Sequence, residues 1–265
     1  MKKINESIRI RDLLKELHLP GIRESFEQKA AEALQEQAGP LTYLRELLEL
    51  ESTQRREKSV QRRLRESNLP LEKSFETFDL NRLPRKLIHQ VTVLRDGSFL
   101  DRRENILAFG CPGAGKSHLL AALGQELVRT GRRIYFTATS LMVQELLRAK
   151  SELRLDKYLK KLTLFDALII DDIGYVQQDR QEMEVLFTLL AARYERGSVM
   201  ITSNLQFSKW ETIFKDPMTT AAAIDRLVHH SVILELDVPS YRMEQAQQKK
   251  RKIQKGEDEI ESISK

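Results

Sequence analysis

A glycine-rich stretch near the middle of the chain has the residue types and spacing of a phosphate-binding loop. It runs Gly110-Cys111-Pro112-Gly113-Ala114-Gly115-Lys116-Ser117. Glycines allow tight turns that aim consecutive backbone amides at phosphate oxygens, and a following helix presents its positive end to the same anion. In such a loop the lysine reaches the β- and γ-phosphates and the serine hydroxyl binds Mg²⁺. We therefore predict that all eight residues bind ATP, that Lys116 also acts in catalysis, and that Ser117 binds the metal.

An apolar segment later in the chain ends in two adjacent carboxylates. It reads Leu168-Ile169-Ile170-Asp171-Asp172. A strand that ends in acids is the magnesium-side partner of a phosphate-binding loop. Asp171 is predicted to hold Mg²⁺ directly or through water, and Asp172 to polarise the water that attacks the γ-phosphate. Taken alone, the pair would be read as a turn and a helix cap, but the loop upstream favours the catalytic interpretation.

A third polar side chain follows the apolar segment that contains Ile201 and Thr202. Asn204 is predicted to hold the attacking water on the side opposite Asp172. An asparagine after a strand is also a common turn former, and that alternative stays open. A further strand-like segment at 133–137 lies between the two motifs in the chain. Simple nucleotide kinases place the two motif strands side by side, so this segment indicates the larger ATPase class with an additional strand between them.

The elements that position these residues alternate in type from Asn105 onward. Short apolar strands are predicted near 106–109, 134–137, 167–170, 199–202 and 232–236, with helical stretches between them. This alternation predicts an α/β fold with a parallel sheet and helices on both faces. Residues 69–245 are assigned to this ATPase domain, and the charged stretch 246–265 to a polar, flexible tail.

The first 68 residues have almost no strand pattern and are predicted to form a separate helical domain. Apolar residues recur at helical spacing, and Pro20-Gly21 and Gly39-Pro40 interrupt the run, which indicates about three helices. The last of these helices carries six cations: Arg55, Arg56, Lys58, Arg62, Arg63 and Arg65. Four of them fall within about 80° of one another around the helix. A solvated face is one interpretation, and a face that follows the phosphates of DNA is the other.

Composition limits the classes of protein that this chain can represent. It has 265 residues, 41% of them hydrophobic, which is enough for a core and for one to two domains. The single cysteine, Cys111, excludes a disulfide framework and a cysteine-built zinc site. The apolar runs are far shorter than the roughly 18 residues that a membrane span needs. We expect a soluble, cytoplasmic protein with no membrane partner. The net charge of +5 matters through its placement, because a second basic cluster (Arg82, Arg85 and Lys86) follows the helical domain.

Taken together, the loop, the two acids and the asparagine-tipped strand resemble an AAA+ ATPase. The segments 193–198 (RYERGS), 207–210 (FSKW), 214–217 (FKDP), 221–230 (AAAIDRLVHH) and 240–242 (SYR) narrow the resemblance to the IstB-like family. That family contains the ATP-binding helpers of insertion-sequence transposition, and it is a sister of the DnaC and DnaI helicase loaders. The resemblance covers most of residues 70–245.

The resemblance implies roles for two further arginines. Arg226 corresponds to the family's arginine finger, whose planar fork would reach the nucleotide of a neighbouring subunit. Arg193 and Arg196 are the alternatives for that role. Arg242 corresponds to the sensor-2 arginine, which contacts the subunit's own nucleotide. Only 23 residues follow Arg242, so the C-terminal lid of AAA+ proteins is expected to be reduced or absent.

The function expected from this resemblance is ATP-dependent regulation of DNA transposition. The chain would assemble as a homo-oligomer on duplex DNA, with ATP and Mg²⁺ at subunit interfaces. It would hydrolyse ATP and recruit or stimulate a partner transposase. A helicase loader shares the ATPase core and is the first alternative. A small-molecule kinase is the second, and the finger-like Arg226 and the strand of Asn204 argue against it.

Overall fold

The computed structural model describes residues 2–174, 179–206, 209–210, 217–241 and 243–244. The chain forms two compact units, Met1–Arg62 and Arg63–Lys265, which divide inside a long helix. No helix in the described ranges is both long and apolar enough to cross a membrane.

The first unit is helical. It contains α1 (Lys2–Glu16), α2 (Pro20–Gln35) and most of α3 (Pro40–Glu66). A proline begins both α2 and α3, where its missing N–H leaves no helical hydrogen bond unmade. The three helices predicted for this region are confirmed. A small core formed by Ile22, Phe26 and Leu47 joins α2 to α3.

A buried carboxylate on α3 fixes the start of α2. Glu51 Oε2 accepts hydrogen bonds from the backbone N–H groups of Gly21 at 2.7 Å and Ile22 at 3.1 Å, which a helix start leaves without internal partners. Arg55 Nε donates to the other carboxylate oxygen at 2.8 Å. Burial acts to raise the pKa of Glu51, but these hydrogen bonds outweigh it and hold the pKa below its ordinary value. Arg55 therefore has a structural task within the first unit.

The second unit is built on a five-stranded parallel sheet. Its strands are β1 (Asn105–Gly110), β2 (Ile134–Ala138), β3 (Ala167–Ile173), β4 (Ser198–Ser203) and β5 (Ser231–Leu236). They lie in the order β2-β3-β4-β1-β5, and every neighbouring pair is parallel. All five predicted strands are confirmed. β4 lies between the strand of the phosphate-binding loop and the strand of the two acids, so an additional strand does separate them, as in the larger ATPase class. The segment 133–137, on which that expectation rested, instead forms the edge strand β2.

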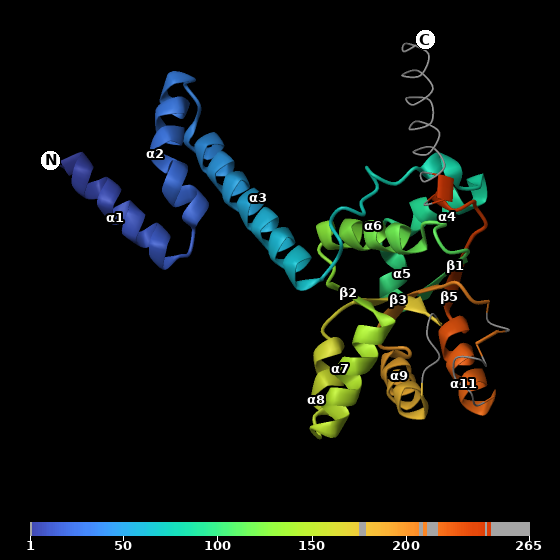
Figure 1. The fold of residues 1–265 in the computed structure, drawn as a ribbon. Coiled ribbons are helices and arrows are strands. Elements are labelled where there is room, and N and C mark those ends of the chain that lie inside the picture. Colours follow the sequence, from blue (N-terminus) through green and yellow to red (C-terminus); the bar gives the residue numbers. More distant parts are fainter. Residues whose placement is uncertain (1, 175–178, 207–208, 211–216, 242, 245–265) are drawn as a thin grey trace, which may run out of the picture. The chain divides into compact units, whose positions relative to one another are not determined.

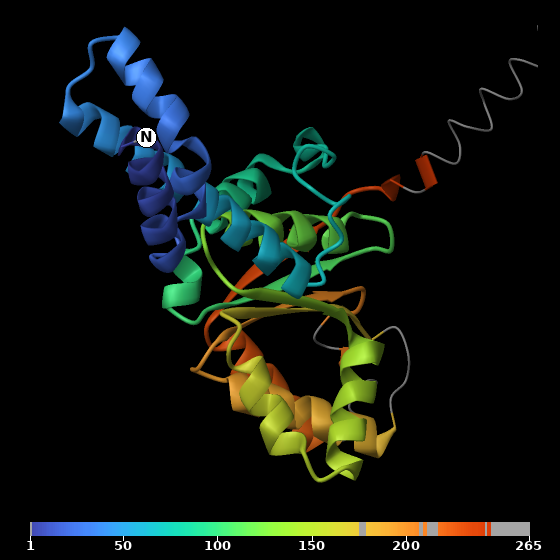
Figure 2. The same cartoon turned by 90° about the vertical axis from the view of Figure 1, so that its left-hand side faces the viewer.

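Helices cover both faces of the sheet (Figure 1 and Figure 2). After η1 (Leu80–Arg82), one face carries α4 (Arg85–Leu94) and α6 (Lys116–Arg129), and α5 (Ser98–Asp101) leads into β1. The other face carries α7 (Thr139–Ser151), α8 (Leu155–Leu162), α9 (Arg180–Arg193) and α11 (Pro217–Val228). The main apolar core includes Leu107, Ile170 and Ile201 of the strands with Leu146 and Leu186 of the helices. Because both faces are covered, the central strands β1, β3 and β4 are buried along most of their length, and their middle residues are apolar.

Candidate functional site

The phosphate-binding loop joins the end of β1 to the start of α6. Gly113 and Gly115 have φ angles of +83° and +99°, where other residues are strained. A Cβ on Gly115 would lie 2.9 Å from the ring of Phe78, and one on Gly113 would overlap Ser240 Oγ. Both glycines are therefore needed for the turn and for the close approach of neighbouring segments. α6 begins at Lys116, so the loop lies at the positive end of a 14-residue helix.

The side chain of Lys116 is buried and folds back onto the loop. Its Nζ donates to the carbonyl oxygens of Gly110 at 2.8 Å and Cys111 at 3.0 Å. Carbonyl oxygens are weaker partners for an ammonium group than ionised phosphate oxygens are. A phosphate in the loop would offer Lys116 such an ionised acceptor, so the lysine fits the role predicted for it.

A bulge carries β3 beyond its predicted end and includes both acids in the strand. The pairing of β3 with β4 shifts register between Ile170 and Ile173, and Asp172 has a left-handed φ of +67°. The buried Thr202 holds this bulge. Its hydroxyl accepts a hydrogen bond from the Asp172 N–H at 2.7 Å and donates to Asp171 Oδ1 at 2.6 Å. One hydroxyl therefore orients the carboxylate of Asp171 and supports the unusual backbone of Asp172.

Asn204 lies beside the base of the loop, where it lines a cavity with Gly110 and Cys111. Its Oδ1 is buried and has no hydrogen-bond partner within the described part of the chain. A buried amide oxygen is normally satisfied by the protein, a water or a ligand. The position of Asn204 fits the predicted contact with a water molecule at the phosphates.

The oxygen donors available to a metal come from two elements. Ser117 lies at the start of α6 and Asp171 near the end of β3. Among the described residues, no group of three or more His, Cys, Asp or Glu side chains could hold a metal ion. Mg²⁺ is usually bound by one or two protein oxygens, with water and phosphate completing its shell. The donor set therefore fits Mg²⁺ that arrives together with a nucleotide.

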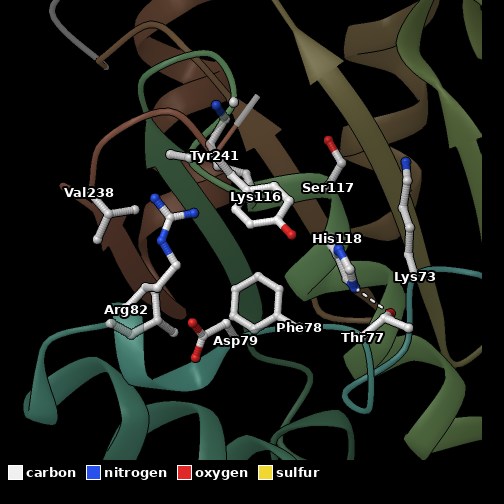
Figure 3. A pocket seen from close by; sticks show the side chains of 14 residues that line it. Lys73, Thr77, Phe78, Asp79, Arg82, Lys116, Ser117, His118, Val238 and Tyr241 are labelled. Atoms are coloured by element: carbon white, nitrogen blue, oxygen red, sulfur yellow. Dashed lines mark hydrogen bonds between the residues drawn. The ribbon is translucent and has the colours of Figure 1, made fainter. Parts of the chain in front are cut away.

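A pocket of about 220 Å³ opens beside the loop (Figure 3). One wall is the loop and the first residues of α6, and a second is the stretch from Lys73 to Leu83. Val238 and Tyr241, after β5, form a third wall. The ring of Phe78 meets the ring of His118 edge-on at 5.1 Å. Aromatic and apolar walls beside a phosphate-binding loop suit the base and ribose of a nucleotide.

Two side chains of α6 hold the second wall in place. Gln125 is buried, and its Nε2 donates to the carbonyl oxygens of Pro70 at 2.9 Å and Lys73 at 3.0 Å. The Nε2 atom of His118 lies 3.1 Å from Thr77 Oγ1 (Figure 3). The helix that begins at the phosphate-binding loop therefore also positions the wall beside it. From the sequence, Phe75 and Phe78 were expected only to anchor a connecting stretch, and the place of that stretch as a wall of this pocket was missed.

Arg226, on α11, lies at the edge of the sheet opposite the phosphate-binding loop. Asn105 begins β1, and its Nδ2 donates to the carbonyl oxygen of Leu227 at 3.1 Å. β1 has six residues, so its two ends are about 17 Å apart. The Arg226 guanidinium lies over the Phe187 ring at 4.9 Å, and its Nη1 donates to the Ala222 carbonyl at 3.1 Å. Arg226 is therefore too far away to contact a nucleotide in its own loop.

Burial rules out Arg193 as an alternative finger. Its side chain is only 2% exposed, and it donates hydrogen bonds to the carbonyl oxygens of Leu162, Phe165, Asp166 and Ser198. Burial lowers the pKa of Arg193 to about 10, although the charge of Asp166 acts in the other direction. Arg193 ties α9 to the starts of β3 and β4. Arg196 is exposed and stays an alternative, whereas Arg242 and the tail 246–265 lie outside the described residues.

The six cations of α3 differ in their surroundings. Arg55 is bound to Glu51 and also donates to the His18 carbonyl, and Arg63 Nη1 donates to the Gly131 carbonyl at 2.5 Å. The other four side chains are exposed: Arg56, Lys58, Arg62 and Arg65. In the second unit, α8 adds three exposed lysines at helical spacing that our sequence interpretation did not single out: Lys157, Lys160 and Lys161.

Comparison with known proteins decides the family. The chain matches the IstB-like ATP binding proteins over residues 12–249. It belongs to that family. An insertion sequence ATP-binding protein of Sinorhizobium fredii is 42% identical over 255 residues, which cover 95% of this chain and 86% of the relative. The insertion sequence IS5376 ATP-binding protein of Geobacillus stearothermophilus is 36% identical, with 93% of this chain and 99% of the relative covered. The resemblance inferred from the motifs is confirmed.

Solved structures confirm the fold class of this IstB-like chain. DnaI matches with a TM-score of 0.54 and 19% identity, over 64% of this chain and 95% of that one. The DnaC helicase loader matches with a TM-score of 0.53 and 18% identity, over 62% and 96%. AMPPCP-bound DnaA from Aquifex aeolicus matches with a TM-score of 0.53 and 18% identity, over 64% of this chain and 51% of that one. At these identities the likeness shows the AAA+ fold alone.

The Thr202 hydroxyl gives a direct test of how the acids are held. Thr202→Val keeps the side-chain shape but leaves the Asp172 N–H and one Asp171 oxygen without their partner, which should lower the free energy of unfolding by about 1–3 kcal/mol. Thr202→Ser should restore most of it. Denaturant unfolding measures both, with Thr137→Val as the control, because Thr137 is also a buried strand threonine and its hydroxyl donates to the Ala138 carbonyl at 3.3 Å rather than to a carboxylate. Equal losses in Thr202→Val and Thr137→Val would show that the bulge does not depend on this hydroxyl.

Proposed function

We propose that this chain is an ATP-dependent regulator of DNA transposition that works as a homo-oligomer. It binds ATP with Mg²⁺, assembles on duplex DNA, hydrolyses ATP, and recruits or stimulates a partner transposase. The observation that carries the proposal is the membership in the IstB-like family, combined with a complete phosphate-binding loop and two acids, oriented by a buried threonine, at the same edge of the sheet. The names of relatives such as the Geobacillus protein connect that family with insertion sequences.

The residues at the carboxyl edge of the sheet have separate tasks in the proposed hydrolysis. Lys116 neutralises charge on the β- and γ-phosphates, and the amides of the loop and of the α6 start hold them in place. Bound Mg²⁺ would supply charge neutralisation at the phosphates, with Ser117 and Asp171 as its protein donors. Asp172 accepts a proton from the attacking water, and Asn204 positions that water through its Oδ1, which has no partner among the described residues.

The proposed site is completed by a second subunit. Contacts with Phe187 and with its own helix hold Arg226 at the edge of the sheet opposite the loop. It can therefore contact only a nucleotide bound to a neighbouring subunit. A guanidinium delivered in this way stabilises the charge that develops on the transferred phosphoryl group. Arg242 is proposed to contact the subunit's own nucleotide. ATP binding and assembly would then favour each other.

The proposed DNA contacts are cations to which the described part of the chain gives no structural task. Arg56, Lys58 and Arg65 are exposed on α3, and the lysines of α8 form a second exposed row. Such side chains bind phosphates without reading the sequence of bases. Arg55 and Arg63 are less suited, because each already donates to protein acceptors.

Two alternatives are weaker. A small-molecule kinase of the simple type would have its two motif strands side by side, whereas β4 separates β1 from β3 here. A helicase loader shares the fold, but DnaI and DnaC are only 18–19% identical to this chain, against 42% for the Sinorhizobium insertion-sequence protein. A preference for duplex DNA, together with no affinity for a replicative helicase, would favour the transposition function.

The proposed roles predict that one substitution abolishes ATP binding and that another slows hydrolysis without affecting binding. Lys116→Ala should abolish binding of a fluorescent ATP analogue. Asp172→Asn should bind the analogue normally but hydrolyse ATP about 100-fold more slowly, because the neutral amide cannot accept the proton. Asp179→Asn is the control, since Asp179 is exposed and caps α9. Tight binding by Lys116→Ala would contradict the assignment of the loop, and normal turnover by Asp172→Asn would contradict the role of that carboxylate.

The proposed DNA face predicts a change in salt dependence. Replacing Lys58 and Arg65, which lie about 20° apart around α3, together by Ala should lower the slope of log affinity against log salt by about 0.9 for each DNA phosphate that is no longer bound. The matched control replaces two exposed arginines that already have carboxylate partners and lie outside α3 and α8: Arg11 and Arg102. Fluorescence anisotropy with a labelled duplex measures both slopes. If both double variants give the same slope as the wild type, Lys58 and Arg65 lie only on a solvated face.

A further inference from the structure

Arg82 belongs to the second basic cluster of the sequence, yet its guanidinium lies at the nucleotide pocket. Its Nη2 donates to the Pro239 carbonyl at 3.0 Å and pairs with Glu244 Oε2 at 2.8 Å. Its Cζ lies 5.1 Å from the centre of the Tyr241 ring. Figure 3 shows Arg82 between Val238 and Tyr241 at one side of the pocket. Arg82 therefore binds the segment that follows β5.

That segment also touches the phosphate-binding loop. The Tyr241 N–H donates to the Gly113 carbonyl at 3.1 Å. The Ser240 hydroxyl occupies the space that a Cβ on Gly113 would need. Arg82 itself belongs to the wall formed by the stretch from Lys73 to Leu83. Four residues before it in that wall, the ring of Phe78 packs against Gly115 of the loop. Contacts thus run from one pocket wall through Arg82 to the opposite wall, and both walls meet the loop.

We propose that Arg82 is a positioning residue of the nucleotide site, which clasps Pro239, Tyr241 and Glu244 against the stretch before α4. A planar guanidinium can hold a carbonyl oxygen, a carboxylate and an aromatic ring together, which the smaller lysine ammonium group cannot do. Without the clasp, the wall that carries Val238 and Tyr241 would have to be ordered when the nucleotide binds, and this would weaken binding. The inference rests on the proposed ATP binding.

The exposure of Arg82, compared with that of the other cations in its cluster, distinguishes a role at the pocket from a role in DNA binding. The Arg82 side chain is 21% exposed, whereas Arg85 and Lys86 are exposed residues at the start of α4. A cation that follows DNA phosphates needs access to solvent, and its loss should change the salt dependence of DNA binding. A cation that clasps a pocket wall should change nucleotide affinity instead.

The test measures the affinity of the full-length chain for a fluorescent ATP analogue with Mg²⁺. Arg82→Ala and Arg82→Lys should both bind about tenfold more weakly, since each loses charged hydrogen bonds that lysine cannot replace together. Glu244→Gln should weaken binding in the same direction but less. Arg85→Ala, which removes the same charge three positions away, should bind as the wild type does. Melting without nucleotide shows whether each variant is folded, and the milder Arg82→Lys and Glu244→Gln carry the test if Arg82→Ala is not.

Each outcome decides between distinct interpretations. A wild-type chain that binds no ATP analogue would overturn the proposed function and this inference with it. If the wild type binds and the Arg82 variants bind equally well, only the clasp is overturned. An Arg82→Lys variant that binds as the wild type does beside a weakened Arg82→Ala would also overturn it, because a positive charge would then suffice without the joint contacts of the planar guanidinium to the Pro239 carbonyl, Glu244 and the Tyr241 ring. An unchanged salt slope for DNA in Arg82→Lys and Arg82→Ala supports the clasp, and a slope lower by about 0.9 in Arg82→Ala would assign Arg82 to a phosphate of DNA.

Discussion

Parallel strands place all their carboxyl ends along one edge of a sheet, and this constraint decides where the chemistry of the chain can lie. β1 leads into the phosphate-binding loop, β3 carries Asp171 and Asp172, and β4 leads to Asn204 at the same edge. Each helix returns the chain to the edge where the strands begin. Arg226, near the end of α11, lies at that edge. Because about 17 Å of β1 separates the two edges, a subunit cannot bring its own Arg226 to its own loop. The proposed ATPase site therefore requires a neighbour.

Hydrogen bonds of polar side chains, in addition to apolar packing, fix the geometry at the carboxyl edge. Thr202 links β4 to the two acids, Gln125 ties α6 to the pocket wall, and Arg82 contacts the segment after β5. Thr202 and Gln125 are buried, where hydrogen bonds are strong because the dielectric constant is low, and losing one partner leaves the other group unsatisfied. Since the loop, the wall that Gln125 holds and the segment after β5 line one pocket, a nucleotide bound there would influence the loop and the segment after β5 together. That coupling would connect ATP binding with the surface offered to a neighbouring subunit.

Much of this architecture follows from local patterns, and the rest depends on contacts that are remote in sequence. The five strands and the loop were predictable because apolar runs, glycines and the lysine-serine pair have fixed spacing in the chain. The burial of Arg193 was not, because its four carbonyl partners come from two separate segments. Thr202 looked like an ordinary strand residue, since only the bulge in β3 brings the Asp172 N–H to its hydroxyl. Arg82 was grouped with its basic neighbours because Glu244 lies far along the chain.

The central claim is that two subunits build one ATPase site, and mixing two inactive variants tests it most directly. Arg226→Ala keeps an intact loop but supplies no finger, whereas Lys116→Ala keeps the finger but has a defective loop. Each variant alone should hydrolyse almost no ATP in the presence of duplex DNA. Mixed oligomers should regain a substantial fraction of wild-type turnover, because some interfaces then join an intact loop to an intact Arg226. Turnover that stays absent at every mixing ratio, or full activity of Arg226→Ala alone, would contradict the account.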